Sequence, residues 1–298
     1  MLLSLGKTNH GQTLFGRAMR HKEVKMCPVG ALAFYLAMRF DKTQEFKDWT
    51  AEDFMDNEKW FDRKLLVDPT RSDVNLDKAM NNNSYKNAIK TILAELNIPS
   101  IHFVHLGRTL GPKILEMLQM SSDEIRLLGN WEPKIQETSY STKLPMAAIR
   151  AMGGFETSQG MHYNPRTIVT EGLDVLKQLS PFYWVSTCLA GVEIATLEGH
   201  AKYTALCFLK IMDDLNTTLI QDAAAMYVKY PNRRNHPLFD LKVFRSIQFK
   251  VRTIFVREIM WVFSGSLVGF WLFFCLIFSP RPAFHQDNGR YTGQNGIP

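Results

Sequence analysis

His105-Leu106-Gly107-Arg108 opens the most informative part of this 298-residue sequence, which continues through Leu128-Gly129-Asn130-Trp131 to Tyr140. A tyrosine hydroxyl can attack a DNA phosphodiester and form a covalent phosphotyrosyl link. A guanidinium group, together with imidazole or indole N–H groups, can hold the non-bridging phosphate oxygens during such an attack. These residue types are therefore chemically able to hold one DNA phosphate.

Each of these residues also has an ordinary structural interpretation. Trp131 is a residue type that commonly packs in the core of a helical domain, and Tyr140 is of a type that is commonly half buried. His105 is also compatible with a simple role at the start of a helix. The phosphate site therefore depends on the ordered set and not on any single member of it.

The ordered set resembles the tyrosine recombinase family, whose pattern is His-x-x-Arg, then His or Trp, then a nucleophilic Tyr. This resemblance implies that His105 and Arg108 hold the scissile phosphate. It further implies that Trp131 is a third phosphate donor and that Tyr140 is the nucleophile. The fold that it implies is a helical core that closes around duplex DNA.

Other segments are similar to the fungal branch of that family, which holds inner-kinetochore centromere-binding factors and Crypton-type transposon recombinases. The resemblance covers about residues 1 to 255. The segments that carry it are Gly6-Lys7-Thr8-Asn9, Arg20-His21-Lys22, Cys27-Pro28-Val29-Gly30, Tyr140-Ser141-Thr142-Lys143-Leu144-Pro145, Ile149 to Phe155, Tyr163-Asn164-Pro165-Arg166, Pro181-Phe182-Tyr183-Trp184 and Leu219 to Ala224.

One part of the family pattern has no counterpart here. Lys7 lies at an expected hairpin turn and matches the catalytic Lys of the family, but no residues before it supply the further upstream Arg. Losing one phosphate donor costs on the order of 3 kcal/mol of transition-state stabilisation, whereas binding is shared among many contacts. We therefore expect duplex DNA binding without strand exchange. The alternative is an active Crypton-type recombinase that takes the Arg from a longer natural N-terminus or a partner protomer.

The expected DNA contacts are basic residues of the first half of the chain. Since phosphate contacts fix position without reading sequence, we expect salt-dependent binding with modest sequence preference. Besides Lys7 and Arg108, the candidate contacts are Arg20, Lys22, Lys113, Arg126, Lys143 and Arg150, with Arg17, His21 and Lys134 as further members of the basic surface.

Composition agrees with this expectation but does not establish it. The chain carries 35 Lys and Arg against 29 Asp and Glu, a net charge of +6, and a basic balance favours a polyanionic partner. The four cysteines lack C-x-x-C spacing, which argues against a zinc ribbon or a disulfide framework and suits a reducing compartment. We expect no metal or cofactor, a nuclear location, and duplex DNA as partner, with a homodimer as a further possibility.

Turn and helix signals predict a mainly α fold with a small N-terminal β-hairpin. The hairpin would join residues 2–5 and 14–19 across the turn of residues 6–11. Residues 41–84 are polar and irregular and predict a long surface excursion. Apolar spacing predicts helices over 31–40, 85–96, 108–120, 125–128, 146–152, 171–179, 204–215, 217–230 and 241–258, with Ser121 and Glu124 as a capping box.

The expected domain organisation follows from these elements and from the resemblance. Residues 1–155 would form a tyrosine-recombinase-like catalytic-domain core that lacks its N-terminal part. Residues 156–258 would form a C-terminal helical extension, residues 259–278 a separate apolar segment, and residues 279–298 a disordered tail.

The apolar segment 259–278 contains no charged residue and is long enough to span a bilayer. Lys250, Arg252 and Arg257 precede it, so the globular part would stay on the cytosolic or nucleoplasmic side. Three interpretations stay open: a transmembrane anchor at the nuclear envelope or an endomembrane, a foreign sequence joined to the family-like part, and a buried core helix. The first also allows a membrane-anchored scaffold as the function.

Overall fold

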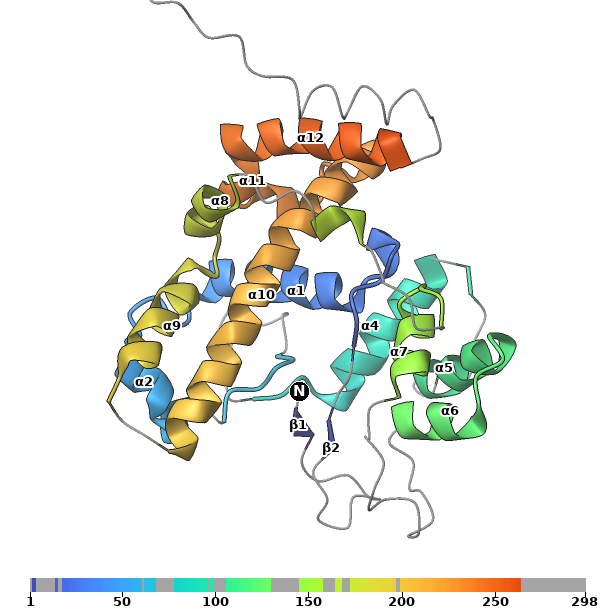
Figure 1. The fold of residues 1–298 in the computed structure, drawn as a ribbon, viewed down its shortest axis with the longest axis horizontal. Coiled ribbons are helices and arrows are strands. Elements are labelled where there is room, and N and C mark those ends of the chain that lie inside the picture. The colour runs from blue at the N-terminus through green and yellow to red at the C-terminus, as the bar shows by residue number, and fades with distance from the viewer. Residues whose placement is uncertain are drawn as a thin grey trace, which may run out of the picture. The chain divides into compact units, whose positions relative to one another are not determined.

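Helix α10, which runs for 30 residues from His200 to Lys229, is the element against which many others pack. The structure is a computed structural model, and it describes residues 2–3, 14–15, 18–60, 62–67, 78–95, 97–98, 106–129, 145–157, 164–167, 172–196 and 199–263. Figure 1 shows α10 crossing α1 and running alongside α9. Its second half is largely buried, and residues such as Leu219, Ile220 and Ala223 are fully buried.

The described part of the chain is mainly helical. Contacts divide the chain into two units, residues 1–256 and residues 257–298. The α-helices are α1 (Pro28–Thr43), α2 (Ala51–Met55), α3 (Asn57–Trp60), α4 (Asn82–Glu95), α5 (Leu106–Met117), α6 (Ser122–Leu128), α7 (Met146–Met152), α8 (Leu173–Leu179), α9 (Tyr183–Ile194), α10, α11 (Lys242–Arg245) and α12 (Ile247–Phe263). The 3-10 turns are η1 (Val24–Met26), η4 (Pro165–Thr167), η5 (Pro231–Arg233) and η6 (Pro237–Asp240).

Two short strands lie where the sequence predicts a hairpin. β1 (Leu2–Leu3) pairs antiparallel with β2 (Leu14–Phe15), with Leu2 opposite Phe15. The expected turn between them, including Lys7, lies outside the described residues.

Several predicted helices are confirmed, and their ends have clear local causes. α1 begins at Pro28, which has no N–H to leave unsatisfied, and the Cys27 Sγ accepts a hydrogen bond from the Gly30 N–H. The helices predicted over 85–96, 108–120, 125–128, 146–152 and 171–179 correspond to α4, α5, α6, α7 and α8. Helix α9 has no counterpart among the predicted helices.

The predicted surface excursion over residues 41–84 is wrong for its first part. The Phe46 and Phe54 rings are buried, and both pack within 6.2 Å of the Phe208 ring on α10. Thr50 caps α2 in a capping box with Asp53. The segment is polar on average, but a few aromatic side chains are enough to bury it.

Two predicted helix boundaries are also wrong. The helices predicted over 204–215 and 217–230 are the single helix α10, because burial of Leu215, Leu219 and Ile220 outweighs the weak helix propensity around residue 216. Conversely, the helix predicted over 241–258 is broken at Ser246, which has an extended conformation. The Ser246 Oγ accepts a hydrogen bond from the Phe249 N–H, so Ser246 caps the start of α12.

The expected domain boundary at residue 155 would place α1 and α10 in different domains. In the structure these two helices pack against each other. Within the described residues, no helix is both long enough and apolar enough to span a bilayer. Of the predicted apolar segment 259–278, only residues 259–263 are described, as the end of α12.

Candidate nucleic-acid interface

The predicted phosphate site falls mostly outside the described residues. His105, Trp131, Tyr140 and Lys7 all lie there, as do Lys143, Arg17 and Lys134. Arg108 lies in the first turn of α5, where the structure describes the backbone. The proposed convergence of these side chains on one phosphate therefore stays a prediction.

Three of the predicted DNA contacts lie on one group of packed helices. Lys113 lies on α5, Arg126 on α6 and Arg150 on α7, and these helices contact one another. Their shared core consists of Leu115, Ile125, Ala148 and Ala151, with Met120 and Leu128 packed against it. In Figure 1 the three helices lie side by side.

Hydrogen bonds at helix ends fix α6 against α7. The Ser121 Oγ accepts from the Glu124 N–H, which confirms half of the predicted capping box. The Glu124 carboxylate does not complete the box in its own helix, because its Oε2 accepts from the Ala148 N–H at 3.0 Å. Glu124 thus caps the N-terminus of α7, whose own cap residue Pro145 has no side-chain acceptor.

The cations of this group differ in their surroundings. Lys113 is exposed. The Arg126 guanidinium lies 2.9 Å from the Asp123 carboxylate in a partly exposed ion pair, and the Arg150 Nε donates to the Glu156 carbonyl oxygen at 3.0 Å. Ion pairs at the surface contribute at most about 1 kcal/mol, so the Arg126–Asp123 pair adds little to stability.

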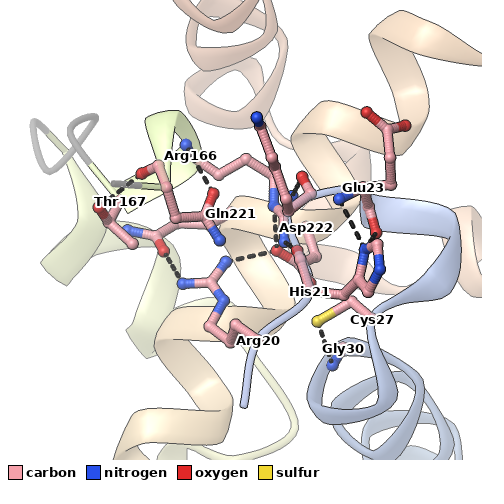
Figure 2. Close-up of polar contacts among 11 residues, drawn as sticks. Arg20, His21, Glu23, Cys27, Gly30, Arg166, Thr167, Gln221 and Asp222 are labelled. Carbon is pink, nitrogen blue, oxygen red and sulfur yellow. Dashed lines mark hydrogen bonds and ion pairs between the residues drawn. The ribbon is translucent and has the colours of Figure 1, made fainter. Parts of the chain in front are cut away.

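Arg20 lies in a buried polar cluster (Figure 2). The backbone of Lys22, another predicted contact, also takes part, because its carbonyl oxygen accepts a hydrogen bond from Arg166. Lys22 is exposed. Arg20 instead points inward: its Nη2 forms an ion pair with Asp222 Oδ1, and its Nη1 donates to Gln221 Oε1 at 2.6 Å. The internal partners occupy the Arg20 guanidinium, and its contact with DNA stays a prediction.

Asp222 is the centre of this cluster. Its carboxylate is fully buried on α10, and its Oδ1 also accepts from Arg166 Nε at 2.8 Å. Arg166 Nη1 and Nη2 donate to the carbonyl oxygens of Lys22 and His21 at 2.6 and 2.7 Å. One buried carboxylate thus binds two guanidinium groups and connects η4 and the chain before α1 to α10.

The start of α1 is shaped by the same carboxylate. A Cβ on Gly30 would overlap Asp222 Oδ2, so the close approach of α1 and α10 requires glycine there. Burial and the neighbouring Asp222 charge raise the pKa of the Cys27 thiol. Cys27 therefore stays protonated at neutral pH.

Segments far apart in the sequence meet at this cluster. Arg20-His21-Lys22, Cys27-Pro28-Val29-Gly30, Pro165-Arg166 and the Gln221-Asp222 pair all contribute atoms to it (Figure 2). In the sequence these segments are separate, and local patterns do not predict that they form one network. A signal was present, because Gln221-Asp222 interrupts an apolar run in the middle of α10.

No group of three or more His, Cys, Asp or Glu side chains in the described ranges could hold a metal ion.

The fold and this interface define a mainly helical protein whose N-terminal segment, η4 and α10 are joined by a buried Arg–Asp–Arg network. Residues 4–250 match the family described as "Centromere DNA-binding protein complex CBF3 subunit, domain 2", and the chain belongs to that family. No curated protein and no solved structure matches the chain.

Proposed function

We propose that this chain binds duplex DNA as a subunit of a centromeric complex in the nucleus. The observation that carries the proposal is the family match, which spans residues 4–250 and so includes the helices from α1 to α11. The cationic side chains of Lys113, Arg126 and Arg150 on the packed helices α5, α6 and α7 support it, because Lys and Arg are the groups that neutralise DNA phosphates.

We further propose that the core is tyrosine-recombinase-like and binds DNA without strand exchange. The support is the ordered set of His105, Arg108, Trp131 and Tyr140 in the sequence. In this proposal Arg108 and His105 hold a backbone phosphate, and Tyr140 does not attack it. The predicted homodimer and the predicted membrane anchor have no supporting observation among the described residues.

Titration of the full chain into fluorescently labelled duplex DNA tests the binding proposal. Fluorescence anisotropy would be followed between about 50 and 200 mM salt, where phosphate contacts give a strong salt dependence. We expect binding at the lower salt and a steep negative slope of log K against log salt. Absence of DNA binding at about 50 mM salt would overturn the proposal.

A nicked suicide substrate tests the catalytic alternative. We expect no covalent adduct from the wild-type chain, and equal DNA affinity for the wild-type chain and Tyr140→Phe. An adduct that forms with the wild-type chain and disappears in Tyr140→Phe would establish the active recombinase instead.

A further inference from the structure

The basic excess of this chain is concentrated in a segment that follows the predicted DNA contacts in the sequence. Residues 229–250 contain six of the 35 basic residues and one of the 29 acidic residues, so this segment carries +5 of the net charge of +6. Its six cations are all exposed: they are Lys229, Arg233, Arg234, Lys242, Arg245 and Lys250. We call residues 229–250 the C-terminal basic segment.

An aromatic cluster holds this segment in place. The rings of Tyr227, Phe239, Phe244 and Phe249 pack with centroid distances between 4.8 and 5.9 Å. Arg245 and Lys250 directly follow two of these rings in the chain. The cations are therefore attached to a packed platform.

The turn between α10 and α11 is ordered by successive backbone hydrogen bonds. The Arg233 N–H donates to Tyr230 O at 2.9 Å, and the His236 N–H donates to Arg233 O at 3.1 Å. Pro231 and Pro237 restrict the backbone at both ends. Because this turn is ordered before any ligand arrives, binding through it costs less conformational entropy than binding through a flexible tail.

The cations of the segment differ in how far their charge is already compensated. Lys229 pairs with Glu23 at 2.5 Å, and Arg245 pairs with Asp240 at 2.8 Å. By contrast, Arg233, Lys242 and Lys250 form no ion pair with any other residue that the structure describes. These three cations can bind an external anion without breaking an existing pair.

Arg234 is positioned by its own chain. Its Nε donates to Tyr227 O at 2.8 Å, and its guanidinium lies 4.4 Å from the centre of the Tyr227 ring. Stacking on a ring fixes the plane of a guanidinium group, which is the group best suited to bidentate phosphate binding. Arg234 is therefore an oriented donor beside the unpaired Arg233.

The turn of residues 231–237 favours a nucleic acid over a membrane surface. Its exposed side chains are Pro, Asn, Arg and His only, with no aliphatic or aromatic side chain to enter a lipid layer. Elsewhere in the segment, Ile247 is the exposed large apolar side chain. Asn232 and Asn235 add polar groups to the turn, and Asn side chains commonly accompany Arg and Lys at phosphate and sugar contacts.

We propose that the C-terminal basic segment is a second contact with the phosphate backbone of duplex DNA, in addition to the predicted contacts on α5, α6 and α7. This inference rests on the proposed function, because it assigns a further surface to the same ligand. The segment fixes position on the duplex and does not read base sequence.

The test compares two triple variants of the full chain. Arg233→Gln with Lys242→Gln and Lys250→Gln removes the three cations without an ion pair. The matched control, Lys42→Gln with Lys47→Gln and Lys78→Gln, removes the same charge from exposed lysines elsewhere. Three lost phosphate contacts reduce the magnitude of the salt slope by about 2.7, which makes the affinity ratio of wild type to variant about 40-fold larger at 50 than at 200 mM salt.

Each outcome of this comparison bears on the inference. A reduced slope in the first variant with an unchanged slope in the control supports it. An unchanged slope in the first variant, or an equal reduction in both, overturns it while leaving the proposed DNA binding intact. A wild-type chain that binds no DNA overturns both proposals. A fourth outcome concerns vesicles of anionic lipid. If the first variant binds such vesicles less tightly than the wild-type chain but binds DNA equally well, the segment contacts a membrane surface and the inference is overturned.

Discussion

Asp222→Asn is the substitution that most directly tests the account of the buried network. The side chain keeps its shape but loses the charge that compensates two guanidinium groups. Asp222 is fully buried, and the exposed fractions of the Arg166 and Arg20 side chains are 7% and 18%. Removing one partner of a buried pair leaves an uncompensated charge and costs about 3 to 5 kcal/mol.

The assay is urea unfolding of the full chain, followed by circular dichroism. We expect a lower midpoint with an unchanged slope, which indicates a loss of stability without a change in compactness. Asp240→Asn is the control, because its pair with Arg245 is more than 60% exposed on both sides and contributes at most about 1 kcal/mol.

Two results would refute this reasoning. One is a decrease in the free energy of unfolding for Asp222→Asn that is no larger than the decrease for Asp240→Asn. The other comes from replacing all three charges, as in Arg20→Met with Arg166→Met and Asp222→Leu. Exchanging a whole buried network for apolar groups of similar volume is commonly neutral or stabilising. We therefore expect this triple variant to be more stable than Asp222→Asn, and a less stable triple variant would contradict the electrostatic explanation.

Three further predictions follow from the described geometry. Gly30→Ala places a methyl group against Asp222 Oδ2 and should destabilise the fold by about 1 to 3 kcal/mol, so an unchanged urea midpoint would contradict that contact. Cys207 is exposed whereas Cys27 is buried with a raised pKa, so Cys207→Ser should remove a rapidly reacting thiol from a DTNB assay of the native chain, and Cys27→Ser should not. Burial lowers the pKa of Arg252 to about 10. Above that pH the folded state therefore binds fewer protons than the unfolded state. The free energy of unfolding of the wild type, relative to that of Arg252→Met, should rise between about pH 9 and 11. A difference between the two proteins that does not change over this pH range would contradict the lowered pKa of Arg252.

Local signals in the sequence were sufficient for many of the helices. Ser121 precedes α6, where the sequence predicts a capping box. Helix α7 spans the predicted range of residues 146–152. These signals work because capping and turn formation involve residues within a few positions of one another.

Predictions failed where distant contacts outweighed local preference. The polar segment after α1 is folded because the Phe46 and Phe54 rings meet Phe208 on α10. The continuity of α10 through Asn216 likewise depends on burial by other helices. Average polarity and helix propensity carry no information on such partners.

The sequence by itself determined the mainly helical class, the positions of many helix ends, the family resemblance and the net positive charge. Only the tertiary structure decided that Arg20 turns inward to Asp222, that Arg166 ties η4 to α10, and that Gly30 is required where α1 meets that carboxylate. The physical reason is one of range. Caps and turns arise among near neighbours in the chain, whereas a buried charge is stable only beside partners that folding brings from about 200 residues away.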